Sequence, residues 1–224
     1  MDGELLSQVG AAYVNDALYR NVRKEPATAD LLDDLTDDPE DLAAFEEDHA
    51  RLYADRAVND SFSGRFYPGR YGDGSFAVWY AALSEEAVLR EYAYWSILLA
   101  LKGGWTRETG PAVLNYDRTL FAIDCRSLLM DLRGVTADLT HSTDYALTQQ
   151  IGRYMMEAPH PGILAPSARL DGGVSAVMFV AHPLSNTRIC REVRYAVAME
   201  ERQVTVFEGE RELDVIDCRE WFPV

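Results

Sequence analysis

The amino-acid sequence predicts an α+β fold built around a single core, with a helical extension at its N-terminal end. Strand-like apolar runs become frequent only after about residue 51, and helical segments interleave with them at 84–102 and 143–157. Their order is irregular, which argues against the strict βαβ repeat of a doubly wound sheet. The chain has 224 residues, 48% hydrophobic and 26% charged, which is enough for one well-packed globular domain.

Residues 1–48 are predicted to form an acidic helical extension, and residues 49–224 the main domain. Five apolar residues recur near the start at near-helical spacing: Leu5, Leu6, Val9, Tyr13 and Ala17. This spacing predicts an amphipathic helix over residues 1–25. The acidic segment at 26–50 predicts short helices broken at Pro39. Its acids lack the D-x-D-x-D-G order of a calcium-binding EF-hand loop, so a solvated acidic face is the preferred interpretation.

In the main domain, five runs have the β-branched and aromatic content of strands: SFAVWYAA, TLFAID, VSAVMFVA, VRYAVAM and QVTVFEG. The helix that follows the first run has clear start and stop signals. Ser84 is its predicted N-cap, and Glu85 and Glu86 lie in the first turn, where the helix dipole favours acids. Gly103–Gly104 is its predicted stop.

Glu91 is the unexpected residue of this helix. An apolar stripe runs along one helix face: Val88, Tyr92, Trp95 and Leu99. At 100° per residue, Glu91 falls at the edge of that stripe and faces the protein. A buried carboxylate is costly unless it is paired, hydrogen-bonded or protonated. It either pairs with an arginine or caps a backbone group, or it belongs to a site with Arg70 in the preceding loop and Tyr80 at the strand end.

A second polar segment begins near residue 140 and contains DYALTQ and GILAPSARLDGG. Ser142 or Thr143 is predicted to cap a helix in which Thr148, Ile151 and Met155 share one face. Taken alone, PSAR is interpreted as a loop with a solvated arginine, followed by a Gly-Gly bend. Neither GDG nor DGG matches a P-loop or a GxGxxG motif.

Charge and residue usage exclude several classes of function. A formal net charge of -16 disfavours nucleic-acid binding, which requires positive charge to neutralise phosphates. No apolar run is long enough to span a membrane, and the first residues lack the order of a signal peptide, so we expect a cytoplasmic protein without a membrane partner. The three cysteines and four histidines are scattered, so neither disulfides nor a metal site is expected.

Several motifs, taken in order, resemble the RES domain, the toxin half of a class of bacterial toxin–antitoxin pairs. They are the loop GRYGDGSF, a YAA-type strand end, a glutamate eleven residues after its tyrosine (Tyr80 to Glu91), the helix start DYALTQ, and the turn GILAPSARLDGG. The resemblance covers roughly residues 50–208, and the ordered combination is far more specific than any one motif.

The resemblance implies an ADP-ribosyltransferase-like split β-sheet with peripheral helices, acting on NAD as substrate rather than as cofactor. It implies that Glu91 lies at the ribose, that Tyr80 and Arg70 hold the dinucleotide, and that an earlier arginine assists them. Arg51 in HARLYADR has about the right separation from Arg70, and Arg56 and Arg65 are rivals. The implied substrate-binding residues also include Thr148, Gln149 and Ser167. The resemblance also implies inorganic phosphate as an optional co-substrate.

The chain departs from the family pattern at one hydroxyl. Where relatives have a serine just before the glutamine of the helix start or two residues earlier, this chain has Thr148 and Ala146. Three functions therefore stay open: NAD glycohydrolase or phosphorylase, ADP-ribosyltransferase acting on a protein, and a degenerate module that binds a nucleotide without turnover. The implied partner is an Xre-type antitoxin, and a homodimer within such a complex stays open.

Overall fold

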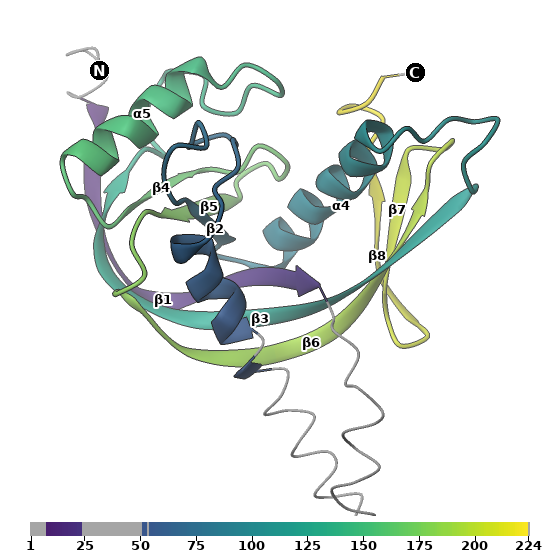
Figure 1. The fold of residues 1–224 in the computed structure, drawn as a ribbon, viewed down its shortest axis with the longest axis horizontal. Helices are drawn as coiled ribbons and strands as arrows, with labels where there is room; N and C mark the ends of the chain where they lie inside the picture. Colours follow the sequence, from purple (N-terminus) through teal and green to yellow (C-terminus); the bar gives the residue numbers. More distant parts are fainter. Residues whose placement is uncertain (1–7, 24–50, 53, 224) are drawn as a thin grey trace, which may run out of the picture.

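The computed structural model describes residues 8–23, 51–52 and 54–223, and within these ranges it has an α+β fold (Figure 1). Eight strands form one mixed sheet in the order β1-β2-β5-β4-β3-β6-β7-β8. They are β1 (Gly10–Arg23), β2 (Trp79–Ala82), β3 (Val113–Asp131), β4 (Gly162–Pro166), β5 (Val174–Met178), β6 (Leu184–Ala198), β7 (Gln203–Glu208) and β8 (Arg211–Asp217). The described helices are α4 (Glu85–Lys102), α5 (Ala146–Glu157) and a helix at 54–63. The predicted α+β class is confirmed.

Five of the strands close into a ring. β1 pairs with β3 along its whole length, from Gly10↔Asp131 to Arg23↔Arg118, and it also pairs with β2 at Tyr19↔Ala82. The pairings β2–β5, β5–β4 and β4–β3 complete the circle. One buried cluster draws side chains from all five ring strands, among them Leu18, Trp79 and Phe121. The ring therefore encloses a hydrophobic core of its own.

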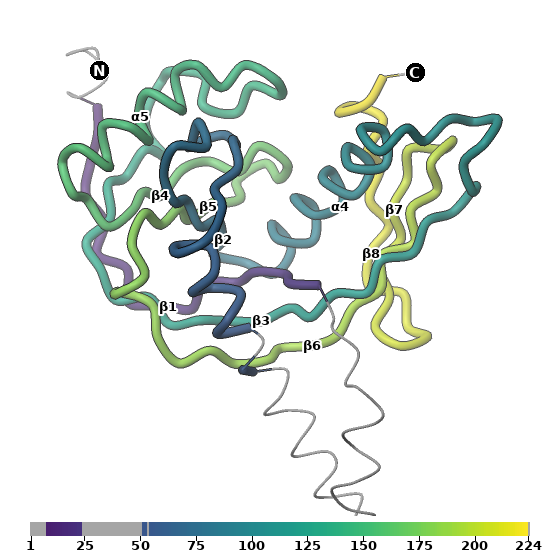
Figure 2. The backbone as a smooth tube through the Cα atoms, in the orientation of Figure 1, coloured from purple at the N-terminus to yellow at the C-terminus, as the bar shows by residue number. Residues whose placement is uncertain are grey.

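The sheet continues beyond the ring through β6, β7 and β8. β3 and β6 run side by side across the width of the molecule (Figure 2). α4 packs on this extension, where Leu89, Ala93 and Ile97 are buried against side chains of β6, β7 and β8. α5 packs instead against the ring strands β4 and β5, through Ile151 and Met155. The two helices thus flank the space above the curved strands (Figure 1).

The helix predicted over residues 1–25 is wrong for residues 10–23, which form β1. Val14, Leu18 and Val22 are its buried residues, and a spacing of four fits both one face of a helix and alternate positions of a strand. Pairing with β3 decides between the two. The rest of the predicted extension, apart from residues 8 and 9, lies outside the described residues, at 1–7 and 24–48.

The other secondary-structure predictions are largely confirmed. Ser84 caps α4, and its side-chain oxygen accepts a hydrogen bond from the Ala87 amide. β4 and β8 were not predicted as strands. α5 starts at Ala146, later than predicted, and neither Ser142 nor Thr143 caps it, because its N-cap residue is Tyr145.

No helix in the part of the chain that the structure describes is both long and apolar enough to span a membrane. The same residues contain no group of three or more His, Cys, Asp or Glu side chains that could hold a metal ion.

Because β1 supplies part of the ring core, truncating Leu18 should destabilise the whole domain. Leu18 is fully buried, so Leu18→Ala should lower the free energy of unfolding by about 2–5 kcal/mol. The matched control is Leu128→Ala on β3, where the side chain is 59% exposed and the expected change is within about 0.5 kcal/mol. Denaturant unfolding measures both, and equal effects would contradict the inclusion of β1 in the core.

Candidate functional site

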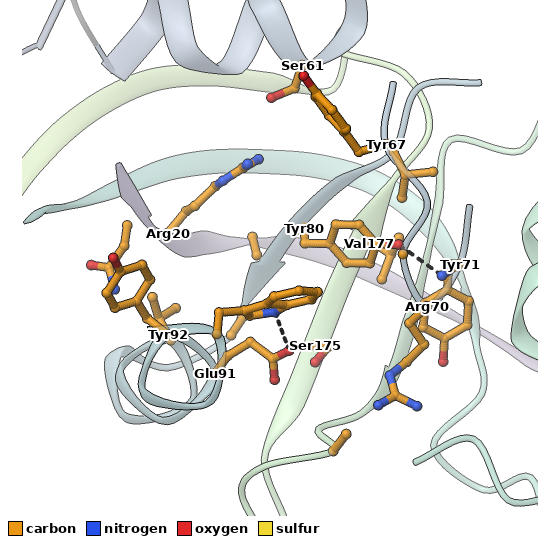
Figure 3. A pocket seen from close by; sticks show the side chains of 18 of the residues that line it. Arg20, Ser61, Tyr67, Arg70, Tyr71, Tyr80, Glu91, Tyr92, Ser175 and Val177 are labelled. Carbon is orange, nitrogen blue, oxygen red and sulfur yellow. Dashed lines mark hydrogen bonds between the residues drawn. The ribbon is translucent and has the colours of Figure 1, made fainter. Parts of the chain in front are cut away.

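A cavity of about 560 Å³ lies between β1, β2, α4 and the loop that precedes β2. This volume is within the range of small-molecule sites. Its wall is rich in aromatic rings, and five charged residues line it: Arg20, Asp60, Arg65, Arg70 and Glu91. In the view of Figure 3, the Tyr80 ring lies between the guanidinium groups of Arg20 and Arg70.

Glu91 projects from α4 into this pocket, as its helical phase predicted. Trp95, one turn later on the same helix face, donates a hydrogen bond from Nε1 to the Glu91 carboxylate at 3.3 Å. Burial raises the pKa of the Glu91 carboxyl above its ordinary value, and the positive charges of Arg169 and Arg70 partly oppose that rise. In the part of the chain that the structure describes, Glu91 forms no direct ion pair. The prediction that Leu99 belongs to the buried apolar face of α4 is wrong, because its side chain is 53% exposed.

Tyr80 forms the pocket wall on β2 and also fixes the preceding loop. Its hydroxyl accepts a hydrogen bond from the Tyr71 amide at 2.9 Å. Gly69 packs so closely that a Cβ there would lie 3.0 Å from the Tyr80 hydroxyl oxygen, so this position favours glycine. Burial is the main reason that the pKa of Tyr80 rises to about 12. Tyr80 therefore stays neutral and presents its ring to the pocket.

Arg70 lies in the loop that Tyr80 fixes, and it also lines the pocket. Its Nη1 donates to the carbonyls of Leu139 and His141, at 3.0 and 2.9 Å. The guanidinium lies 4.7 Å from the centre of the Tyr145 ring. These contacts hold a positive charge on the wall near Glu91, in a protein whose net charge is strongly negative.

The other predicted substrate-binding residues of the second segment do not line the pocket. Gln149 donates from Nε2 to the Gly69 carbonyl at 3.0 Å and so holds the loop that carries Arg70. Thr148 is buried, and its hydroxyl donates to the Tyr145 carbonyl at 3.1 Å. The Ser167 hydroxyl accepts from the amides of Arg169 and Leu170, which shapes the PSAR turn.

The three candidates for the earlier arginine lie in different places. Arg51 is exposed on a helical segment and does not line the pocket. Arg56 is also exposed, and it forms an ion pair with Asp60 at 3.5 Å. Arg65 lines the pocket, with its guanidinium 5.9 Å from the centre of the exposed Tyr67 ring.

The structure adds a pocket arginine that the sequence interpretation missed. Arg20 comes from β1, opposite Phe121 on β3, and its guanidinium lies 5.2 Å from the centre of the Trp79 ring. Burial lowers the pKa of Arg20 to about 10. Its Nη1 is buried and has no hydrogen-bond partner among the described residues. A buried donor without a partner on a pocket wall is a natural contact for an anionic ligand group.

Arg20 was missed because residues 1–25 were assigned to a helix. The signal lay in the run ALYRNVR, whose alternation fits a strand that would place Arg20 on the same face as Leu18 and Val22. Without that strand, no rule of spacing connects Arg20 to Glu91.

The fold and the pocket define a class: an α+β protein with a cavity of small-molecule size that is lined by a half-buried carboxylate, arginines and aromatic rings. The model of one family, the RES domain, matches residues 47–198, which is more than half of the chain. The chain therefore belongs to the RES domain family, as its motifs predicted. A search of curated proteins finds no match. Tyr80, Glu91 and Arg70 lie within the matched range, whereas Arg20 lies outside it.

The raised pKa of Glu91 makes a prediction about stability. Because the folded protein holds this proton more tightly than the unfolded chain, the contribution of Glu91 to stability is present below pH 4.5, the ordinary glutamate value. It is lost as the pH rises through the folded-state pKa. Glu91→Gln removes this titration. The Tm of the variant minus that of the parent should therefore increase between about pH 4 and about pH 8.

Thermal unfolding followed by circular dichroism at several pH values measures this difference. The matched control is Glu201→Gln, which makes the same substitution at an exposed position in the turn after β6. A pH-independent difference for Glu91→Gln would show that the carboxyl has its ordinary pKa.

Proposed function

We propose that this RES domain degrades NAD by cleaving the bond between nicotinamide and ribose. The observation that carries the proposal is the half-buried Glu91 carboxylate, which lines a pocket together with Arg20, Arg70 and aromatic rings. The proposal includes the ADP-ribosyltransferase-like architecture that the family resemblance implies.

The chemistry matches these residue types. As the bond between ribose C1′ and the nicotinamide nitrogen breaks, its electron pair goes to the cationic ring, which leaves neutral, and positive charge develops on the ribose. A carboxylate held against that charge stabilises the transition state. Water then adds to C1′ and releases a proton to the solvent, or an anionic phosphate oxygen adds in its place. The leaving group needs no proton, so Glu91 acts in its ionised form.

The charge and shape of the pocket also match the substrate. The pyrophosphate of NAD is anionic, and arginine is the side chain best suited to bind it. Arg20 presents a buried, unpartnered Nη1, whereas Arg51 does not line the pocket. We therefore favour Arg20 over Arg51 as the earlier arginine that the resemblance implies. The Tyr80 ring offers a flat apolar wall for a base.

The biological role proposed with this activity is that of a toxin in a type II toxin–antitoxin system, neutralised by an Xre-type antitoxin that blocks the pocket. Because NAD is required throughout metabolism, its loss would stop growth. Co-expression with the antitoxin should restore growth and abolish nicotinamide release by the purified complex.

Release of nicotinamide from NAD, with and without phosphate, tests the activity directly. The parent should release nicotinamide, and dependence on phosphate would identify the acceptor. Glu91→Gln should lower kcat by at least about 100-fold, because it removes charge stabilisation in the transition state. Glu201→Gln should retain activity. No release by the antitoxin-free parent would refute the proposal, and full activity of Glu91→Gln would refute the role of Glu91.

The choice between the two arginines has its own test. Arg20→Met should weaken kcat/KM for NAD by about 10-fold or more, since a charged hydrogen bond is lost, and Arg51→Met should leave it within about twofold. Circular dichroism confirms that both variants are folded. The reverse result, with Arg51→Met impaired and Arg20→Met intact, would return the role to Arg51.

One observation favours a second candidate, a module that binds NAD without turnover. The Thr148 hydroxyl is engaged by the Tyr145 carbonyl, and Ala146 has no hydroxyl, so neither position offers the family serine to the pocket. Tight binding of NAD without release of nicotinamide would establish this candidate. Transfer of label from NAD to a macromolecule would instead indicate ADP-ribosylation of a protein.

A further inference from the structure

Arg169 is a buried cation close to the pocket. It belongs to the PSAR turn, which was interpreted as a loop with a solvated arginine, yet only 6% of its surface is exposed. Its Nη1 donates to the Ala168 carbonyl at 3.1 Å, and its Nε has no hydrogen-bond partner among the described residues. No carboxylate in the described part of the chain forms a direct ion pair with it. A charge buried at such cost calls for an explanation.

Aromatic rings hold the Arg169 guanidinium in place. It lies 3.5 Å from the centre of the Tyr94 ring on α4 and 5.6 Å from the centre of the Trp221 ring. Phe222 stacks on Tyr94 with ring centres 5.0 Å apart, and Trp221 meets Tyr94 edge-on at 6.1 Å. Trp221 and Phe222 belong to the turn at 218–223 that follows β8, and their amides both donate to the Cys218 carbonyl. We call these residues the post-β8 turn.

Helix geometry brings this cation to Glu91. Tyr94 and Trp95 lie three and four residues after Glu91, so all three side chains share one face of α4. Trp95 donates a hydrogen bond to the Glu91 carboxylate, and the Tyr94 ring packs against the Arg169 guanidinium. Among the charges that act on Glu91, Arg169 has the largest effect, ahead of Arg70.

We propose that Arg169 is a positioning residue for Glu91, and that the post-β8 turn belongs to the active site because it holds the Arg169 guanidinium near that carboxylate. The catalytic meaning of this arrangement rests on the proposed NAD cleavage, but the arrangement itself does not. The post-β8 turn lies outside the range matched by the family model, so family membership does not assign it a role.

Several polar and ionisable groups face Glu91 from the elements around it. Arg70 approaches from the loop before β2, and Tyr80 from β2. Tyr94 and Trp95 lie on α4 itself. Tyr145, before α5, interacts with both Tyr80 and Tyr94. Of these groups and Arg169, only the two arginines carry charge at neutral pH, so they are the groups that oppose the rise that burial causes in the pKa of the Glu91 carboxyl.

The test is the titration of the Glu91 carboxyl, followed by carbon-13 NMR in full-length protein labelled at glutamate carboxyls and assigned with Glu91→Gln. This measurement needs no NAD, so it succeeds or fails independently of the proposed activity. Arg169→Met should raise the pKa of the Glu91 carboxyl by about one pH unit or more, because a nearby opposite charge is removed. Arg169→Lys keeps the charge and should titrate close to the parent.

Two further variants separate the post-β8 turn from general packing. Trp221→Ala should shift the Glu91 titration upward by less than Arg169→Met does, since the guanidinium loses one of its rings, and Trp221→Phe should stay close to the parent. The matched control is Arg211→Met on β8, where an exposed arginine pairs with Glu208 and no shift is expected.

Each outcome has a defined meaning. An unchanged titration in Arg169→Met overturns the proposal, and so does a shift in Arg169→Lys as large as that in Arg169→Met. An unchanged titration in Trp221→Ala overturns the part that concerns the post-β8 turn. Should Arg169→Met fail to fold, Arg169→Gln, which also removes the charge, takes its place: it should raise the pKa of the Glu91 carboxyl in the same way, and an unchanged titration would overturn the proposal. If NAD cleavage is measurable, the acid limb of its pH–rate profile should move upward in parallel with the NMR shift.

Discussion

The pairing of β1 with β3 is the constraint on which the rest of the structure depends. It runs from Gly10↔Asp131 to Arg23↔Arg118, and without it the ring of five strands would be open. The ring core, the floor of the pocket and the position of Arg20 all follow from this contact between distant parts of the sequence. Long-range pairing of this kind costs chain entropy, which the burial of Leu18 and its neighbours offsets.

The site contains two groups of residues: some face the pocket, and others hold the pocket-facing residues in place. Glu91, Arg20 and the ring of Tyr80 face the cavity. Gln149 and the Tyr80 hydroxyl are committed to the loop that carries Arg70. This division explains how a protein with a net charge of -16 presents positive charge at one place. Local geometry, rather than overall charge, sets the potential inside a pocket.

Sequence reasoning succeeded where a pattern was local. The cap at Ser84, the phase of α4 and the step from Tyr80 to Glu91 depend on neighbours within a few turns, and the structure has each of them. It failed where tertiary pairing decides. The spacing in the first segment fits a helix and a strand equally well, and only contact with β3 resolves it, so Arg20 stayed hidden. Arg169 was misread because nothing in PSAR indicates that Tyr94 and Trp221 will cover it.

The join between β1 and β2 has a mechanical consequence. A single register pair, Tyr19↔Ala82, connects these strands, whereas the other side of β1 is paired along its full length. β1 and β2 therefore have the fewest paired residues of any neighbouring strands in the ring. Arg20 lies on β1 and Tyr80 on β2, so the two residues are on opposite sides of this junction. A ligand that contacts both residues links β1 to β2 across this weakly paired edge. Its binding energy then also works against local opening of the ring, so occupancy and rigidity of the domain rise together.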